Sequence, residues 1–397
     1  MGDKYLVMVT PDNHNKYYKM IIHGSTWTAE YGRVGYAPQK KDYPLGEFDK
    51  KYNEKIRKGY IDQTSIMMVQ SSPSNDTHTY SDIADKSVAD LMRRLINYAT
   101  KVVKANYSIA AEAVTTAMVD EAQYLIDALE RENNLASFNN LLLRLFTTIP
   151  RAMSQVDAYL AHNIADKGKI MLREQNILNA MRAKVNTTPI KQSNDKNDEK
   201  TSILKELGIT VEPATDKDIA IIKKALGRES ADKFVRAWRV VNAKTQKRFD
   251  EYIKDNHITD VRSFWHGSRN ENWLGILKEG LVLHPANAYI TGKMFGYGTY
   301  YAPRAKKSIG YTSLMGSYWA NGTSSTGFMA LMDVAYGKPY DVYQHRNELC
   351  SFDYGKLQRA CPGANCLHAH AGSSLRNDEI IVYKEEQSTI RYLVEIA

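Results

Sequence analysis

The stretch from Phe264 to Tyr311 contains residue types that could hold and polarise a small ligand. It combines a His-Gly pair, His266 and Gly267, with several tyrosines and with serine. Tyrosine rings stack on flat aromatic groups, and glycine lets a ligand approach the backbone closely. Serine and histidine side chains exchange hydrogen bonds with polar groups. The types and their order predict a pocket for a flat aromatic ligand that carries a carboxamide.

Each of these residues, taken alone, has a commoner structural explanation. A histidine after a strand is more often a hydrogen-bonded structural residue, and Tyr300 beside Tyr301 could belong to the core. A lone glutamate on a strand, such as Glu379, is usually a solvated charge. Packing alone does not predict His, Tyr, Ser, Tyr and Glu in this order, so we favour a site.

The elements that must position these residues belong to a predicted C-terminal domain of residues 201–397. A short strand at residues 262–265 leads into His266, and an apolar strand is predicted at residues 328–335. Two further strands, at residues 379–383 and 390–396, flank a polar turn. The sequence therefore predicts a mixed, mainly β domain.

The preceding chain is predicted to form two further domains. Residues 87–185 repeat apolar side chains at helical spacing and carry no catalytic cluster, which predicts an all-α helical bundle. Residues 1–66 predict a small β-sheet with one helix. Polar linkers are expected at residues 67–86 and 186–200. The predicted fold class is a multidomain α+β protein.

Composition restricts the class of protein and its partners. The chain has 397 residues, a formal net charge of +8 and an ordinary apolar content of 43%. A basic chain favours an anionic partner such as nucleic acid, although many basic proteins bind none. Three cysteines argue against a disulfide framework. The sequence shows no secretory signal and no apolar run of membrane-spanning length, so we expect neither secretion nor a membrane partner.

The run from Tyr31 to Gly35, with the strands before it and the basic helix after it, resembles a WGR domain. That domain grips DNA or RNA ends, so the resemblance implies a nucleic-acid interface. Tyr31 stands where the motif has tryptophan and can still stack on a base or sugar. The alternative is a hairpin with a surface arginine. The residues expected to contact nucleic acid are Tyr31, Arg33, Lys50, Lys51 and Lys55.

Four motifs in the C-terminal domain are similar to the catalytic domain of the poly(ADP-ribose) polymerase family. They are His266–Arg269, Gly296–Ala302, Lys307–Tyr311 and Asn377–Tyr383, in the family's order and at about its spacing. Residues 139–150 resemble part of the family's regulatory helical domain, which restrains access of NAD⁺ until DNA damage is sensed. The resemblance implies an NAD⁺-dependent ADP-ribosyltransferase.

The resemblance also implies roles for individual residues. Gly267, through its backbone, and Ser308 would hold the nicotinamide carboxamide, and Tyr300 and Tyr311 would stack on its ring. His266 would bind the adenosine ribose. Further implied residues are Ser268 and Arg269 for NAD⁺, Glu379 for catalysis with His266 and Tyr300, and Met294 and Lys307 at the acceptor site.

Two positions depart from the family pattern. Val282 stands where many members carry an arginine near the adenine phosphates, so contacts to the diphosphate can differ. Asn377 stands where prominent members have a tyrosine that helps to bind the growing chain. The second change leaves the length of the product open.

The function predicted is a poly(ADP-ribose) polymerase that DNA strand breaks stimulate and that modifies proteins, itself included. The alternatives are a mono-ADP-ribosyltransferase and a catalytically weak nucleic-acid-binding scaffold. NAD⁺ is expected as substrate and no metal is expected. The location would be the nucleus in a eukaryote, and otherwise the cytoplasm or nucleoid.

Four potential metal ligands lie close together in the sequence, but their spacing matches no strong zinc pattern. They are Cys361, Cys366, His368 and His370.

Overall fold

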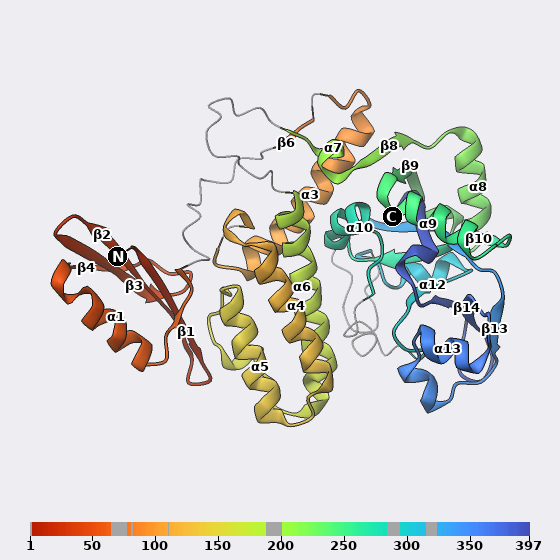
Figure 1. Ribbon diagram of the computed structural model, residues 1–397. Coiled ribbons are helices and arrows are strands. Elements are labelled where there is room, and N and C mark those ends of the chain that lie inside the picture. The colour runs from red at the N-terminus through yellow and green to blue at the C-terminus, as the bar shows by residue number, and fades with distance from the viewer. Residues whose placement is uncertain are drawn as a thin grey trace. The chain divides into compact units, whose positions relative to one another are not determined.

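The computed structural model describes residues 2–64, 78–80, 82–109, 111–187, 201–283, 294–314 and 324–397 (Figure 1). The chain divides into two compact units. One combines residues 1–76 with 100–188, and the other combines residues 77–99 with 189–397. Most of each predicted linker lies outside the described residues. The division into five segments therefore stays a prediction.

The first unit begins with an antiparallel sheet of order β4-β3-β2-β1-β5. Its strands are β1 (Lys4–Thr10), β2 (His14–His23), β3 (Thr26–Arg33), β4 (Gln39–Pro44) and β5 (Ile61–Asp62). Helix α1 (Phe48–Arg57) follows β4. Apolar residues that alternate along β1, β2 and β3 pack with Phe48 in the core of this sheet, which contains Leu6, Tyr18, Met20, Trp27, Ala29 and Phe48.

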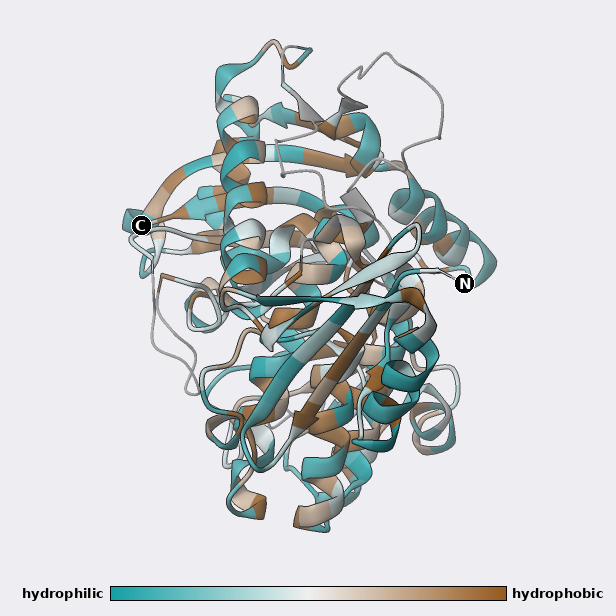
Figure 2. Cartoon of the chain, turned by 90° about the vertical axis from the view of Figure 1, so that its left-hand side faces the viewer, coloured by the Kyte–Doolittle hydropathy of each residue, from teal (hydrophilic) through white to brown (hydrophobic). Residues whose placement is uncertain are grey.

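The rest of the first unit is mainly helical. Its helices are α4 (Thr116–Arg131), α5 (Leu135–Thr148), α6 (Lys167–Thr187) and the last residues of α3 (Lys86–Asn106). Thr115 caps α4 and Asn134 caps α5 through their side-chain oxygens. Figure 2 shows hydrophobic residues interspersed with hydrophilic ones along the helices and strands of the chain, as expected of elements with one buried face. Arg151 and Glu174 form a buried ion pair at 2.7 Å.

The second unit contains the sheets that position the predicted site. The larger has the order β10-β12-β16-β9-β8, and the smaller β11-β15-β14-β13. Strands β6 (His78–Thr79) and β7 (Thr201–Ser202) pair separately. The larger sheet contains β8 (Ile209–Pro213), β9 (Phe234–Asn242), β10 (Val261–Ser268), β12 (Gly327–Ala335) and β16 (Ser388–Ile396). The smaller contains β11 (Thr299–Tyr301), β13 (Pro339–Val342), β14 (Cys366–Ala369) and β15 (Glu379–Val382).

The helices of this unit are short, apart from the part of α3 that belongs to it. They are α7 (Ile203–Leu207), α8 (Asp216–Leu226), α9 (Ala243–Asp255), α10 (Trp273–Glu279), α12 (Ala305–Ile309) and α13 (Tyr354–Ala360). Strand β12 lies between β10 and β16 in the sheet and is almost wholly buried, because its side chains pack in the core of the unit. Its continuous apolar run reflects that central position. No helix in the described ranges is both long and apolar enough to cross a membrane.

The first part of α3 is tied to the larger sheet by a network of ion pairs. Arg94 contacts Glu395 at 2.5 Å, and Arg236 contacts Glu395 and Asp90, each at 2.7 Å. Burial alone would raise the pKa of Glu395, but hydrogen bonds from both arginines outweigh it and hold that pKa below the ordinary value. The charged form of this carboxyl therefore stabilises the sheet.

Candidate active site

Residues from four elements meet where the two sheets of the second unit adjoin. Trp265 in β10 and Ala302, just after β11, exchange backbone hydrogen bonds of 2.9 Å. This bridge places β10, with His266 and Gly267, beside β11, with Tyr300. Strand β15 pairs with β11 through Ile380 and Tyr301, so its first residue, Glu379, lies at the same end.

Gly267 lies against the backbone of α12. A Cβ atom added at Gly267 would meet the carbonyl carbon of Ser308 at 2.8 Å and its Cα at 3.3 Å, with the carbonyl oxygen closer still. Such approaches are far inside normal van der Waals contact. Glycine is therefore required because β10 and α12 touch here. The contact sets the backbone of Gly267 and the buried Ser308 side by side.

His266 is oriented by the backbone of the neighbouring strand. Its Nδ1 lies 3.0 Å from the carbonyl oxygen of Tyr300, and this oxygen accepts a hydrogen bond when Nδ1 carries the proton. The ring of His266 also contacts that of Tyr301, with centroids 6.0 Å apart. The strand pairing thus couples the position of the imidazole to that of Tyr300.

Tyr300 is held by a loop that its own hydroxyl closes. The hydroxyl accepts a hydrogen bond from the backbone N–H of Phe295 at 3.0 Å and donates to the carbonyl of Gly296 at 3.1 Å. Tyr383 donates to the carbonyl of Phe295 at 2.7 Å and so supports the same loop. The sequence marked Tyr383 only as the end of a strand. The signal that could have identified Tyr383 is that the hydroxyl of a buried tyrosine needs a hydrogen-bond partner.

The neighbouring tyrosine has a different environment. The side chain of Tyr301 is only 2% exposed, whereas Tyr300 is half-buried. The hydroxyl of Tyr301 donates to the side chain of Ser388 at 2.6 Å, inside the core. Burial raises the pKa of Tyr301 to about 12. Alternation along β11 thus sends the two rings to opposite sides. The resemblance to the family selects Tyr300 for the site, and Tyr300 is the less buried of the two.

The predicted catalytic glutamate has a cationic partner. The ammonium group of Lys307, in α12, forms an ion pair with the carboxylate of Glu379, and both side chains are less than one-fifth exposed. Tyr311, two residues after α12, is 43% exposed. Partial burial and the negative charge of Glu379 raise the pKa of Tyr311. The carboxylate therefore acts electrostatically on a ring that is predicted to stack on nicotinamide.

The other predicted NAD⁺ and acceptor residues lie nearby in the same unit. The hydroxyl of Ser268 accepts a hydrogen bond from the Asn272 side chain at 3.1 Å. The guanidinium of Arg269 lies 3.7 Å from the Glu271 carboxylate. The carbonyl of Met294 contacts the imidazole of His345 at 3.0 Å.

The residues predicted to bind nucleic acid belong to the first unit. The ring of Tyr31 stacks on that of Tyr18, with centroids 5.5 Å apart. The ammonium group of Lys55 lies 4.0 Å from the centre of the Tyr18 ring. Lys51 forms an ion pair with Glu54 at 3.2 Å, and Lys50 is exposed. Lysines and an aromatic pair thus gather on α1 and the adjoining strands.

Arg33 has partners inside the first unit that the sequence did not indicate. Its guanidinium donates to the backbone carbonyl of Asn13 at 2.9 Å and to the Asn13 side chain at 2.8 Å. It also donates to the carbonyls of Met153, at 3.3 Å, and Ser154. This side chain connects the small sheet to the segment that follows α5. A phosphate at Arg33 would therefore have to replace or share these contacts.

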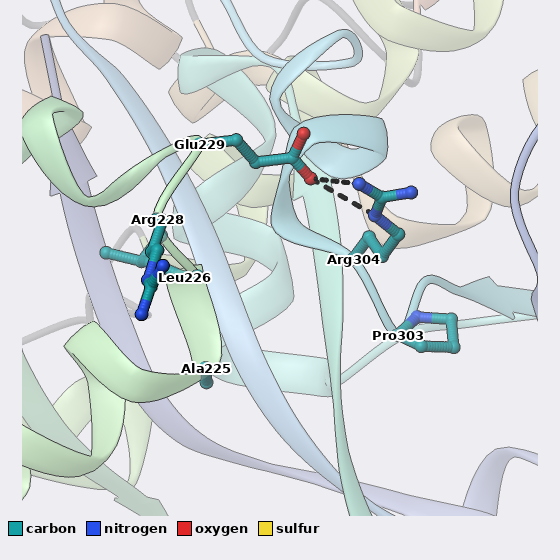
Figure 3. A pocket seen from close by; sticks show the side chains of 7 residues that line it. Ala225, Leu226, Arg228, Glu229, Pro303 and Arg304 are labelled. Atoms are coloured by element: carbon teal, nitrogen blue, oxygen red, sulfur yellow. Dashed lines mark hydrogen bonds and ion pairs between the residues drawn. The ribbon is translucent and has the colours of Figure 1, made fainter.

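A hollow of about 400 Å³ lies at the end of α8 (Figure 3). Across it, the guanidinium of Arg304 contacts the carboxylate of Glu229 at 2.7 Å. None of the predicted site residues lines it. The lining residues are Ala225, Leu226, Gly227, Arg228, Glu229, Pro303 and Arg304.

Comparison with known families agrees with this arrangement. Residues 216–397 match the model of the poly(ADP-ribose) polymerase catalytic domain, and residues 3–66 match that of the WGR domain. The chain belongs to the poly(ADP-ribose) polymerase family. It is an NAD⁺ ADP-ribosyltransferase, and its chemistry uses NAD⁺ as substrate and needs no metal. Together the WGR and catalytic domains indicate nucleic-acid binding and NAD⁺ use.

Individual relatives cover different shares of the chain. "Uncharacterized protein 101L" of Invertebrate iridescent virus 6 is 33% identical over 180 residues, which are 44% of this chain and 74% of that protein. "Putative poly [ADP-ribose] polymerase-like 100L" of the same virus is 28% identical over 42% of this chain and 88% of its own. Human poly [ADP-ribose] polymerase 2 is 31% identical over 33% of this chain, and only 26% of its own length is covered.

Proposed function

We propose that this transferase is a polymerase that DNA strand breaks stimulate and that attaches ADP-ribose to proteins, itself included. The observation that carries the catalytic part is the pairing of the nearly buried Glu379 carboxylate with Lys307, beside the strands that bear His266 and Tyr300. We further propose that the protein acts in the nucleus if its source is a eukaryote, and otherwise in the cytoplasm or nucleoid.

The first task of the site is to hold nicotinamide in one orientation. The Gly267 backbone N–H and C=O pair with the carboxamide, and the Ser308 hydroxyl adds a third hydrogen bond. Their close contact supports this role because it sets the spacing between these groups. Tyr300 and Tyr311 stack on the ring, and His266 binds the adenosine ribose. Fixed partners of this kind remove much of the entropic cost of reaching the transition state.

The second task is to stabilise a positively charged ribose. The bond between the ribose C1′ and the nicotinamide nitrogen breaks with its electron pair leaving on nicotinamide, and an oxygen of the acceptor forms the new bond to C1′. The transition state is oxocarbenium-like, as in glycoside cleavage. The carboxylate of Glu379 binds the ribose 2′-hydroxyl, stabilises the developing charge and polarises an acceptor hydroxyl, whose proton it accepts as the new bond to C1′ forms. Positioned proton transfer of this kind is typically worth roughly 10²–10⁴ in rate.

Lys307 then has two linked functions. Its ammonium pairs directly with the Glu379 carboxylate and so holds that carboxylate in place. It also lies at a position that the family uses at the acceptor site, where an anionic ADP-ribose unit would pass. Chain growth would bring acceptor phosphates towards this ammonium, and we infer that they compete with Glu379 for it.

The DNA response is assigned to the first unit. Tyr31, Arg33 and the lysines of α1 form a basic and aromatic group suited to the end or nick of a nucleic acid. The helical segment is proposed to restrain access to the NAD⁺ site until DNA is bound. A mono-ADP-ribosyltransferase remains the second candidate, because Asn377 occupies a position at which family members bind the growing chain.

The test incubates the full chain with labelled NAD⁺, with and without nicked duplex DNA, and resolves the products on a denaturing gel. We expect a ladder of long products on the protein that increases with DNA. A single added unit would favour the mono-transferase. Equal labelling with and without DNA would refute DNA stimulation.

A further inference from the structure

Three potential metal ligands meet at the β13 edge of the smaller sheet in the second unit. Asp341 lies in β13, His368 lies in β14, and His370 follows β14 directly. One ligand atom from each lies within 4.8 Å of the other two. Neither Cys361 nor Cys366 takes part, and Cys366 is fully buried.

The sheet itself brings the three residues together. Strands β13 and β14 pair in parallel, with Asp341 opposite His368. Because side chains alternate along a strand, His368 and His370 point to the same face as each other. Their rings stack with centroids 3.9 Å apart. The cluster therefore follows from strand register rather than from a mobile surface loop.

The distances suit a small transition-metal ion. Asp341 Oδ1 lies 2.7 Å from His370 Nε2 and 3.9 Å from His368 Nδ1. Tetrahedral zinc with bonds of about 2.0–2.1 Å places neighbouring ligand atoms about 3.3 Å apart. The two observed separations lie on either side of this value, so a modest side-chain rotation would admit the ion.

The outer contacts of His368 match those of a metal-bound histidine. Its Nε2 lies 3.1 Å from the Asp378 carboxylate, and its Nδ1 faces Asp341 and the Tyr336 hydroxyl, 2.8 Å away. A carboxylate that accepts the proton of one ring nitrogen orients the other towards a metal. Asp378 thus orients His368 in the way that outer carboxylates orient histidines in metal proteins.

Charge and ligand type decide the class of ion. Two imidazoles and one carboxylate favour Zn²⁺, Co²⁺ or Ni²⁺, whereas Mg²⁺ and Ca²⁺ require oxygen ligands. The nearby guanidinium of Arg262, 3.8 Å from the Tyr336 ring centre, is paired with Asp260 at 2.7 Å, which offsets its charge. The exposed side of Asp341 leaves room for water to complete the coordination.

We propose that Asp341, His368 and His370 bind one divalent transition-metal ion of the zinc class, which links β13 to the end of β14. The ion has no part in ADP-ribose transfer. It joins two strands of the sheet whose next strand, β15, begins with Glu379. Its expected effect is to stabilise that sheet.

The test uses the full chain, freed of metal with a chelator and titrated with Co²⁺ and then with Zn²⁺. We expect visible Co²⁺ absorption that saturates at one equivalent and that Zn²⁺ displaces, together with a rise in Tm on addition of Zn²⁺. His370→Gln and Asp341→Asn should each weaken Co²⁺ binding at least tenfold. Asp378→Asn, which removes only the outer carboxylate, should weaken it about 10–100-fold.

His162→Gln is the matched control, because His162 also pairs with an aspartate, Asp157, at 3.6 Å but outside the cluster. Its Co²⁺ affinity should equal that of the wild type. The proposal is overturned if the wild-type chain shows no saturable Co²⁺ spectrum, or if His370→Gln and His162→Gln bind Co²⁺ equally. The wild-type titration alone decides the matter should a cluster variant fail to fold.

Discussion

Replacing Gly267 with alanine tests the contact that sets the geometry of the nicotinamide site. The added Cβ would lie 2.8 Å from the carbonyl carbon of Ser308. Carbon atoms pack best at about 3.5–4.0 Å, so this pair alone requires β10 and α12 to separate by about 0.7 Å, and the closer carbonyl oxygen of Ser308 requires more. A misplacement approaching 1 Å can cost on the order of 10²-fold in rate. We therefore expect Gly267→Ala to lower kcat/KM for NAD⁺ by about that factor.

A 10²-fold loss of rate corresponds to about 2.7 kcal/mol, so the stability cost is of similar size and is measured separately. Overpacking a close contact typically costs about 1–3 kcal/mol, which leaves a domain of this size folded. Gly310→Ala is the matched control, because an added Cβ there would meet only the Lys307 carbonyl oxygen, at 3.4 Å. It lies in the same segment and should leave kcat/KM within about twofold of the wild type.

The assay measures release of nicotinamide from NAD⁺ at several concentrations, with urea unfolding in parallel. Loss of activity with retained stability in Gly267→Ala, and neither effect in Gly310→Ala, supports the argument. A Gly267→Ala enzyme with unchanged kcat/KM would refute the claim that the contact with Ser308 sets the site. Equal losses in both variants would also contradict it.

Three further changes test other parts of the account. Glu395→Gln should cost about 3 kcal/mol of unfolding free energy at neutral pH, because it removes the shared partner of two arginines. The pKa of Glu395 is lowered in the folded protein, so the difference in unfolding free energy between wild type and variant should be complete above the unfolded pKa of about 4.3. The difference should vanish as the pH falls through the folded pKa of Glu395. A difference in urea unfolding that does not change with pH would contradict this. Arg33→Ala should cost roughly 2 kcal/mol through lost charged hydrogen bonds, whereas Arg57→Ala at an exposed position should cost less than about 0.5 kcal/mol, and equal urea midpoints would contradict the assignment. Lys50→Ala should weaken nicked-DNA binding and reduce the salt dependence of log K by about one, whereas Lys254→Ala should not; an unchanged salt slope in titrations would remove Lys50 from the interface.

The sequence was sufficient for the mixed α+β fold class and for the family. Strand patterns and motif order predicted the mixed α+β class, and the matches to the WGR and catalytic domains confirm the family. Strand β9 (Phe234–Asn242) lies between β8 and β16 in the larger sheet. Because β16 is about 150 residues further along the chain, local spacing alone does not show this pairing.

What the sequence could not predict depends on contacts between distant residues. The partners of Arg33, Met153 and Ser154, lie about 120 residues away. The ion pair of Lys307 with Glu379 requires α12 to lie beside the start of β15. Spacing alone shows none of these contacts.

The boundary between the two compact units and the cluster of potential metal ligands also depend on contacts between residues that are distant in the sequence. Helix α3 is one continuous amphipathic pattern in the sequence, yet its residues belong to two units because its first part is anchored by Glu395. Asp341 joins His368 through parallel strand register, 27 residues apart. The sequence instead drew attention to two nearby cysteines.

The most direct test of the catalytic account compares Glu379→Gln with the wild type in both NAD⁺ binding and product formation. Glu348→Gln is the control, because Glu348 is also paired with a cation, Arg346, at 3.3 Å but at an exposed position. We predict that Glu379→Gln retains NAD⁺ affinity within a few-fold and loses polymer formation, with nicotinamide release reduced at least 10²-fold. Polymer formation by Glu379→Gln at the rate of Glu348→Gln would contradict the assignment of Glu379 as the group that drives the transfer.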